Sequence, residues 1–124
     1  MAPSDLLDLI TLQNLVDLDD GNHGLVSEMI AIFRDDTPSR IEGILDAAAR
    51  GDVDDFSRAA HALKGGAGAL GAKVLRSLAA DLENLGRSGS VDTGADLAAR
   101  LQACFQASLA ALEAYVREGE ASQG

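Results

Sequence analysis

The chain has 124 residues, 47% of them hydrophobic, which is sufficient for one domain with one buried core. Its formal net charge of −10 argues against nucleic acid as a partner, because nucleic-acid binding depends on neutralising phosphates. The single cysteine, Cys104, excludes an internal disulfide, and no run approaches the roughly 18 apolar residues of a membrane span.

The composition also predicts the fold class and the compartment. Alanine and leucine dominate, β-branched and aromatic residues are sparse, and the two prolines leave room for long helices, so we expect an all-α protein. Cys104 lies in an apolar stretch and is expected in the core. The first basic residue is Arg34, so the N-terminus lacks the positive region of a signal peptide, and we expect a cytoplasmic protein.

The first part of the chain predicts a short helical segment followed by one long helix. Residues 4–18 are leucine-rich and predict one or two short helices. Apolar residues then recur at helical spacing from His23 to Arg50. Pro38 is expected either to kink this helix or, with Thr37 as N-cap, to restart it. His23, at the start of the helix, is expected to be solvent-exposed or to cap the helix.

The next predicted helix carries one of the two histidines, His61. Gly51 is predicted to end the preceding helix and Asp52 to cap this one. Apolar residues then recur at steps of three and four and form one buried seam, which consists of Val53, Phe56, Ala60, Leu63, Ala67 and Leu70. His61 falls on the outer half of the helix, and Lys64, three residues later, is its neighbour on the helix surface.

Three glycines, Gly65, Gly66 and Gly68, follow His61 inside this apolar pattern. Each costs about 1 kcal/mol relative to alanine in a helix interior. One interpretation is that the helix ends before the glycines, which then form a loop. The other is that side chains are missing so that another molecule can approach His61 closely, because glycine allows close backbone approach. The second interpretation agrees better with the apolar seam, which continues beyond the glycines.

The remainder of the chain predicts two further helices. One covers residues 72–86, and the last runs from about 92 to 116, before a tail over 117–124 that is expected to fray. Four long helices joined by short loops predict an antiparallel four-helix bundle, with the N-terminal segment covering one end. We therefore expect a single domain over residues 1–124 with a core of about 5–117.

Several kinds of chemistry find no support in the sequence. Gly66 to Gly71 match GxGxxG, but that dinucleotide fingerprint requires a preceding strand, and the residues before it are helical by period. No phosphate-binding GxxxxGK[ST] motif is present. Two distant histidines and one cysteine give no convincing metal site. No spacing brings Ser, His and Asp or Cys and His together for hydrolysis.

An exposed histidine can itself act as a nucleophile and form a covalent intermediate. Phosphoryl transfer asks the protein mainly for positioning and for stabilisation of charge, and Lys64 can supply a positive charge beside His61. Residues 58–87 hold five basic and two acidic side chains, a net charge of +3 within an acidic chain. Such a local positive field suits an acidic partner or a phosphoryl group.

The stretch from His61 to Ala72 resembles the phosphoacceptor motif of histidine-containing phosphotransfer (HPt) domains, in which H-x-L-K-G is followed by small residues and then by Leu-Gly. The similarity extends over roughly residues 5–117. Together with Leu82-Glu83-Asn84 on the next helix, the glycine-rich version is also similar to the phosphoacceptor domain of chemotaxis histidine kinases. There a glutamate on the following helix orients the imidazole, and Glu83 takes the corresponding place. An ordinary glutamate at the edge of the buried face is the alternative for Glu83.

The resemblance implies a phosphorelay intermediate of a two-component system. His61 would accept a phosphoryl group from the phospho-aspartate of one receiver domain and pass it to the aspartate of another. Lys64 would stabilise the phosphoryl group, Gly65 and Gly68 would allow approach, and Arg58 would belong to the docking surface. The protein would be a phosphoryl carrier and not an enzyme.

The resemblance also implies the partners. They would be receiver domains of response regulators or a hybrid histidine kinase, with Mg²⁺ held by the receiver and no cofactor or metal held by this chain. Nucleic acid and membrane are not expected as partners, and the chain is expected to be a monomer.

Two alternatives stay open. The chain could be a helical module that binds and sequesters a receiver without being phosphorylated, although such a module would have no need of both His61 and Lys64. It could also be a fragment of a larger hybrid kinase, although the start at Met1 and the polar tail favour a complete small protein. The receivers it serves and the direction of phosphoryl flow are not predicted.

Overall fold

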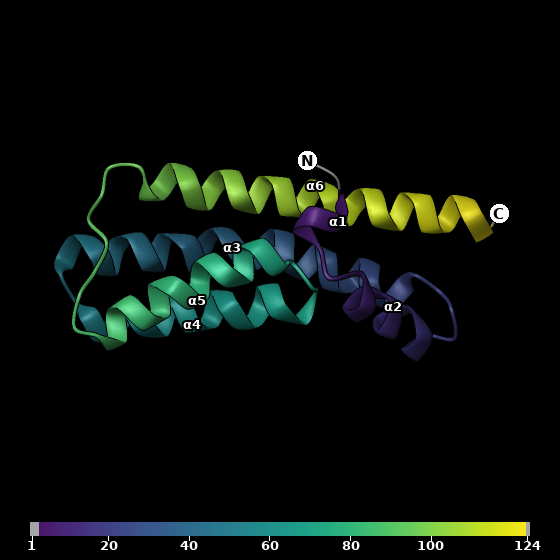
Figure 1. The fold of residues 1–124 in the computed structure, drawn as a ribbon. Helices are drawn as coiled ribbons and strands as arrows, with labels where there is room; N and C mark the ends of the chain where they lie inside the picture. Colours follow the sequence, from purple (N-terminus) through teal and green to yellow (C-terminus); the bar gives the residue numbers. More distant parts are fainter. Residues whose placement is uncertain (1–2, 124) are drawn as a thin grey trace.

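A computed structural model describes residues 3–123, and every element of secondary structure in that range is an α-helix (Figure 1). The all-α prediction is therefore confirmed. Two short helices precede four longer ones, in the order α1 (Pro3–Leu6), α2 (Leu9–Leu18), α3 (Gly24–Arg50), α4 (Val53–Ala69), α5 (Lys73–Arg87) and α6 (Leu97–Gln123). Among these helices, none combines the length and the apolar character needed to cross a membrane.

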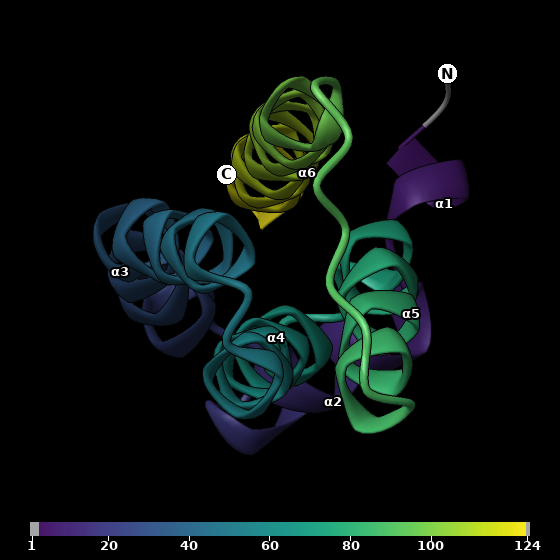
Figure 2. The ribbon, with the colours of Figure 1, turned by 90° about the vertical axis from the view of Figure 1, so that its left-hand side faces the viewer.

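The four longer helices pack side by side as a helical bundle, and consecutive members run in opposite directions along it (Figure 1). Helix α4 packs against α3 and α5, and α6 packs against the same two helices. The view along the bundle places α4 and α6 at opposite corners (Figure 2). The outer face of α4 is therefore turned away from α6.

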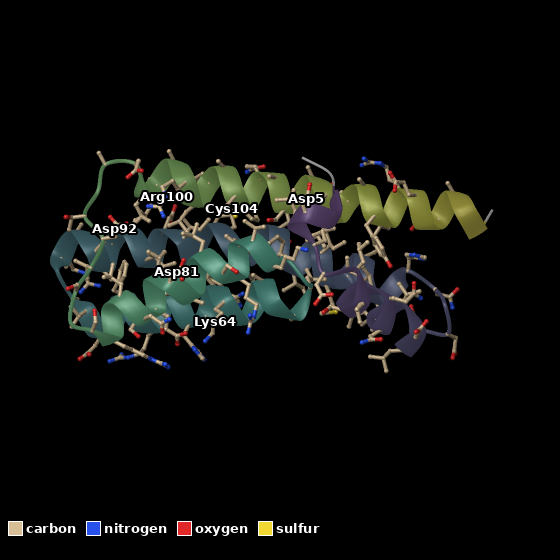
Figure 3. The ribbon with its side chains drawn as sticks, in the orientation of Figure 1. Asp5, Lys64, Asp81, Asp92, Arg100 and Cys104 are labelled. Atoms are coloured by element: carbon tan, nitrogen blue, oxygen red, sulfur yellow. The ribbon has the colours of Figure 1, made fainter. Side chains whose placement is uncertain are left out.

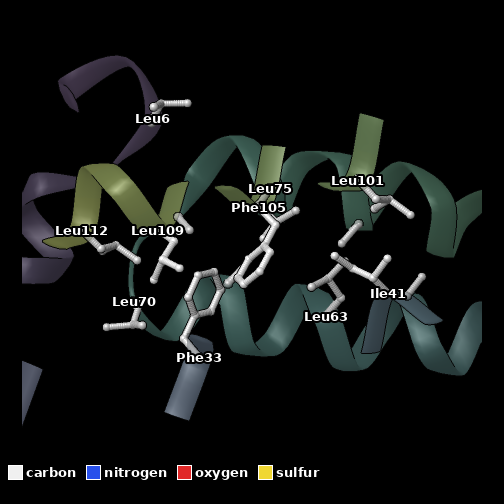
Figure 4. Close-up of a cluster of buried hydrophobic side chains, with 14 of the residues drawn as sticks. Leu6, Phe33, Ile41, Leu63, Leu70, Leu75, Leu101, Phe105, Leu109 and Leu112 are labelled. Carbon is white, nitrogen blue, oxygen red and sulfur yellow. The ribbon is translucent and has the colours of Figure 1, made fainter. Parts of the chain in front are cut away.

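The core lies between these helices and is built from the predicted apolar faces (Figure 4). Phe33 of α3 and Phe105 of α6 meet edge to face, with ring centroids 5.4 Å apart. The buried residues of α4 all belong to the predicted seam and are Phe56, Ala60, Leu63 and Ala67. Full burial of a leucine or phenylalanine contributes about 1.5–3 kcal/mol, so this seam is what holds α4 in place.

The N-terminal segment covers one end of the bundle, as predicted. Helices α3 and α6 have 27 residues each, whereas α4 has 17 and α5 has 15. At 1.5 Å per residue, the longer pair extends about 15 Å beyond the shorter pair. Helix α2 packs against α3 in that region and buries Leu12 and Val16 (Figure 1). The N–H of Asp8 donates to the carbonyl of Gly71 at 2.7 Å, which attaches the segment to the turn between α4 and α5.

Helix α3 continues through Pro38, so the predicted restart with Thr37 as N-cap is wrong. Thr37 is instead fully buried within the helix. A proline in a helix interior removes one backbone hydrogen bond. The helix persists because Phe33 and Ile41, one turn on either side of Thr37, are both buried in the core.

Helix α6 differs from its predicted limits at both ends. It begins at Leu97 and not near Asp92, because the Asp92 carboxylate accepts the N–H of Gly94 at 2.8 Å and stabilises a turn. It then stays helical to the end of the described residues, through the part of the tail that the sequence predicts to fray. Cys104, which the sequence assigns to the core, is only half-buried on this helix.

The last turns of α6 pack against His23, which the sequence predicts to be exposed or capping. His23 does occupy the N-cap position of α3, but its side chain is only 8% exposed and makes no capping hydrogen bond, so the expected exposed or capping side chain is wrong. Its ring lies against Tyr115 of α6, with centroids 6.1 Å apart. At Gly119 a Cβ would collide with the imidazole, so the glycine makes room for it. His23 therefore links the start of α3 to the end of α6.

Candidate functional site

Helix α4 begins at the predicted boundary and continues through the three glycines, as the interpretation of close approach to His61 requires. Gly51 ends α3 in the left-handed conformation, with φ of 68°, and the Asp52 carboxylate accepts the N–H of Asp55 at 3.0 Å. The helix then runs through all three glycines to Ala69, so the interpretation of a loop after Lys64 is wrong. The glycines lie on a regular helix whose other face is anchored in the core.

His61 projects from the outer face of α4, with 64% of its side chain exposed. Its Nδ1 lies 2.6 Å from Oε2 of Glu83, which belongs to α5 and is only 2% exposed. An ionised carboxylate has no hydrogen to donate, so Nδ1 carries the hydrogen in this bond. In the neutral ring the free lone pair is then on Nε2, the other nitrogen.

Two cations bind the same carboxylate. Lys64 Nζ donates to Oε1 of Glu83 at 2.5 Å, and Arg87 Nη2 donates to Oε2 at 3.1 Å. The hydrogen bond from Lys64, followed by that from His61 and the charge of Arg87, holds the pKa of Glu83 below its ordinary value of 4.5, although burial alone would raise it. The carboxylate is therefore ionised at neutral pH, and it joins the predicted neighbours His61 and Lys64.

Arg87 is a member of the site that the sequence analysis did not single out. It follows Glu83 by four residues on α5, and opposite charges at that spacing are neighbours on a helix surface. This spacing is the sequence signal that identifies the pair. Its recognition depends on first assigning a role to Glu83.

Gly86 is a second residue that the sequence analysis did not assign to the site, because it is only the last residue of the predicted helix over 72–86. In the structure Gly86 is buried within α5 and faces Ser57 of α4. A Cβ at position 86 would lie 3.1 Å from Ser57 Cα and 3.0 Å from its nitrogen. Ser57 Oγ donates to the carbonyl of Glu83 at 3.4 Å. Gly86 thus allows α5 to approach α4 closely enough for Glu83 to reach His61.

The three glycines after His61 have different surroundings. Nothing lies within 4 Å of a Cβ built at Gly65, so that position is bare. A Cβ at Gly66 would collide with the guanidinium of Arg40 from α3. One at Gly68 would lie 3.1 Å from Cδ and Nε of Arg76 from α5. Gly65 is therefore the open position, whereas Gly66 and Gly68 are covered by arginine side chains.

Arg58 lies on α4 one turn before His61, and 75% of its side chain is exposed. It forms an ion pair of 3.3 Å with Asp55. Around His61 the structure thus gathers an oriented imidazole, a buried carboxylate and several cations on an exposed helix face. Such an arrangement can accept a group with negative charge from a large partner. Within residues 3–123, no group of three or more His, Cys, Asp or Glu side chains is placed to hold a metal ion.

Comparison with known protein families agrees with this geometry. The family model described as Hpt domain matches residues 28–115, which include α4, α5 and most of α3 and α6. A significant match was found neither among the curated proteins nor among the solved structures.

Proposed function

Since the chain belongs to the Hpt domain family of histidine phosphotransfer modules in two-component phosphorelays, we propose that His61 is its phosphoacceptor. The observation that carries the proposal is the hydrogen bond from Nδ1 of the exposed His61 ring to the buried Glu83. This bond orients the ring and leaves the Nε2 lone pair free to attack. Hpt domains carry phosphoryl groups without kinase activity, and we infer the same of this chain.

In the proposed step, Nε2 of His61 attacks the phosphorus of a phospho-aspartate on a receiver domain. The N–P bond forms while the P–O bond to the aspartate breaks, and the aspartate leaves as a carboxylate. The ring keeps its Nδ1 hydrogen and becomes cationic, and the Glu83 carboxylate faces that charge. The same bond changes in reverse pass the phosphoryl group to the aspartate of another receiver.

Lys64 is proposed to stabilise the phosphoryl oxygens. It lies one turn after His61, and 26% of its side chain is exposed, so a phosphoryl group on the ring is accessible to it. A loose phosphoryl-transfer transition state is stabilised mainly by positioned charge, which the ammonium provides as a point cation. Because Nζ is bound to Glu83 in the resting structure, it has to share that carboxylate with the phosphoryl oxygens or exchange it for them.

The outer face of α4 is proposed to receive the partner. Gly65 leaves open space beside His61, and the side chain of Arg76 covers Gly68. Arg58 adds an exposed cation. Receiver domains of response regulators or of a hybrid histidine kinase are the proposed partners, with Mg²⁺ held by the receiver and no cofactor held by this chain. We infer that the carrier acts as a monomer whose helices α3 to α6 form an antiparallel four-helix bundle.

The experiment is the intact mass of the protein after incubation with phosphoramidate, a small phosphodonor that needs no protein partner. Wild type is compared with His61→Gln and with His23→Gln, which removes the other histidine and serves as the matched control. We expect wild type and His23→Gln to gain one phosphoryl group that brief acid treatment removes. His61→Gln is expected to gain none.

The same samples distinguish the alternatives. Phosphoryl uptake by His61→Gln at the wild-type rate would refute the assignment of the phosphoacceptor. No uptake by any variant, together with binding to a receiver domain, would identify a module that sequesters receivers without being phosphorylated. Circular dichroism of each variant establishes that loss of uptake does not come from unfolding.

A further inference from the structure

Arg40 and Arg76 come from different helices and lie against the same segment of α4. Arg40 belongs to α3 and places its guanidinium where a side chain at position 66 would be. Arg76 belongs to α5 and lays its Cδ and Nε over position 68. Both arginines need the glycine beneath them. Gly66 and Gly68 therefore leave the space that two side chains occupy, and these side chains reach α4 from opposite sides.

Neither arginine has an acidic partner in the structure. Acidic residues outnumber basic ones by 20 to 10 in this chain, and most basic side chains are paired. Arg34, Arg50, Arg58, Arg87, Arg100 and Lys64 all form ion pairs with carboxylates. Within residues 3–123, Arg40 and Arg76 form none. Two positive charges beside α4, the helix that carries His61, are thus available to an external anion.

Their positions bracket the open face beside His61. Gly68 follows His61 by seven residues, which places it about 10 Å along the axis and within about 20° of the same direction. Gly66 follows by five residues and lies about 140° around the helix, on the side of α3. Gly65, which is bare, lies between these directions. A surface that closes over His61 and Gly65 therefore meets a guanidinium on each flank.

We propose that Arg40 and Arg76 form a two-point clamp for an acidic rim on the partner receiver domain and so determine how that partner is oriented over His61. The proposal rests on the proposed function, because the partner it commits to is the domain whose aspartate exchanges the phosphoryl group. Guanidinium groups suit this task, since their planar donors bind carboxylates in two-pronged geometry and remain charged at any working pH. Two anchors on opposite flanks specify a direction, which one anchor does not.

The neighbourhood of Arg40 agrees with a docking surface. Arg40 and Gly66 border a shallow depression of about 170 Å³ that is otherwise apolar, with Met29, Ile32 and Phe33 of α3 in its wall. Ile32 is 59% exposed although it is a large apolar side chain. An apolar contact beside an unpaired arginine is typical of protein interfaces, where arginine is enriched and lysine is depleted.

The test compares Arg40→Gln, Arg76→Gln and the double variant with wild type. The control is Arg100→Gln, which removes the same charge from α6, on the other side of the bundle from Lys64 (Figure 3). The probe is the receiver domain that accepts the phosphoryl group fastest from phosphorylated wild-type protein. Its affinity and association rate are measured by stopped-flow fluorescence at low and at high ionic strength, and phosphoramidate uptake is measured in parallel.

We expect each single variant to weaken receiver binding by about three- to tenfold at low ionic strength, mainly through slower association, and the double variant to lose much of the salt dependence. Phosphoramidate uptake should match wild type in every variant, since the small donor does not use the clamp. Receiver binding by both single variants that equals that of Arg100→Gln would overturn the proposal, as would wild-type protein that binds no receiver. In either case, uptake from phosphoramidate still decides separately whether His61 is the phosphoacceptor.

Discussion

Glu83 is the residue on which the geometry of the site depends. It sits on a helix whose other buried side chains are leucine and alanine, yet its carboxylate is almost fully buried. Hydrogen bonds from His61, Lys64 and Arg87 compensate for the loss of water. A carboxylate held in this way fixes both the rotation of the imidazole and the nitrogen that carries its hydrogen.

The substitution Glu83→Gln tests this role. Glutamine has nearly the same shape but no charge, so it can no longer stabilise the cationic ring, and its amide can present either a donor or an acceptor to Nδ1. We expect phosphoryl uptake from phosphoramidate to slow by about ten- to hundredfold, as for other groups that orient a histidine by a hydrogen bond to its non-reacting ring nitrogen. The measurement is the rate of mass gain, with nitrogen NMR of the ring to report the tautomer. An unchanged rate with an unchanged tautomer would show that Glu83 is an ordinary buried glutamate.

The same carboxylate makes stability depend on pH. The pKa of Glu83 is lower in the folded protein than its ordinary value of 4.5. At a pH above that ordinary pKa, the ionised carboxylate contributes fully to the free energy of unfolding, and this contribution is lost as the pH falls through the lower pKa of the folded state. We therefore expect the free energy of unfolding to fall more steeply on acidification in wild type than in Glu83→Gln. Urea titrations from neutral to acid pH measure both slopes. Parallel slopes would contradict the prediction.

A substitution at Gly65 is expected to change the stability of the helix and the approach of the partner in opposite directions. Alanine fits at this position because nothing lies within 4 Å of its Cβ, and Gly65→Ala should stabilise the helix by up to about 1 kcal/mol. We expect phosphoramidate uptake to be unchanged and transfer from a receiver to be slower, because the added methyl stands where the partner approaches. Urea unfolding and the two transfer rates measure these effects. Transfer from the receiver at the wild-type rate would show that the open space is not used.

At the scale of elements, the approach of α4 to α5 determines whether the site forms. The two helices are linked by a tight turn at Gly71 and pressed together where Gly86 faces Ser57. Two glycines with different tasks thus set one interface. Gly71 adopts a positive φ of 70° at the turn, and Gly86 removes the side chain that would separate the helices.

Gly86→Ala is expected to destabilise the protein and to impair the site together. The new Cβ would lie too close to the backbone of Ser57, and overpacking of this kind costs about 1–3 kcal/mol. If α5 moved outward to relieve this close contact, it would also draw Glu83 away from His61 and slow phosphoryl uptake. Urea unfolding and phosphoramidate kinetics measure the two effects, with Gly65→Ala as the control for adding a methyl to a helix. A stable variant with wild-type kinetics would mean that the interface does not position Glu83.

At the scale of the whole molecule, charge and packing distinguish two regions of the bundle. The chain is strongly acidic, whereas residues 58–87, which lie in α4, α5 and the turn between them, carry a net positive charge. The opposite end is formed by α2, the start of α3 and the end of α6, where His23 and Tyr115 pack together. The exposed face around His61 and this end use different residues, so we expect that each can be altered separately.

Gly119→Ala tests that separation. A Cβ at position 119 would collide with the buried His23 ring, so we expect the last turns of α6 to loosen and stability to fall by about 1–3 kcal/mol. Hydrogen exchange should show loss of protection in those turns, while phosphoramidate uptake at His61 stays as in wild type. A slower uptake would show that the two ends of the bundle are coupled.

The sequence by itself determined the features that depend on local order along the chain. Helical periodicity identified the buried seam of α4 because apolar residues repeat at the spacing of one helix face. Gly51 and Asp52 marked the boundary between α3 and α4 because left-handed ends and N-caps are set by neighbouring backbone groups. The resemblance around His61 and Lys64 identified the family, since that motif lies within a few turns of one helix.

Only the tertiary structure decided which side chains meet across helices. His61 and Glu83 are 22 residues apart, and Arg40 reaches position 66 from another helix, so their contacts depend on how the helices pack and on the glycines that permit close approach. The sequence predicted an exposed or capping His23, because the residues that bury its ring, Tyr115 and Gly119, come nearly a hundred residues later in the chain. Periodicity tells which face of a helix is buried, but the partner of each side chain follows from the geometry of the assembled bundle.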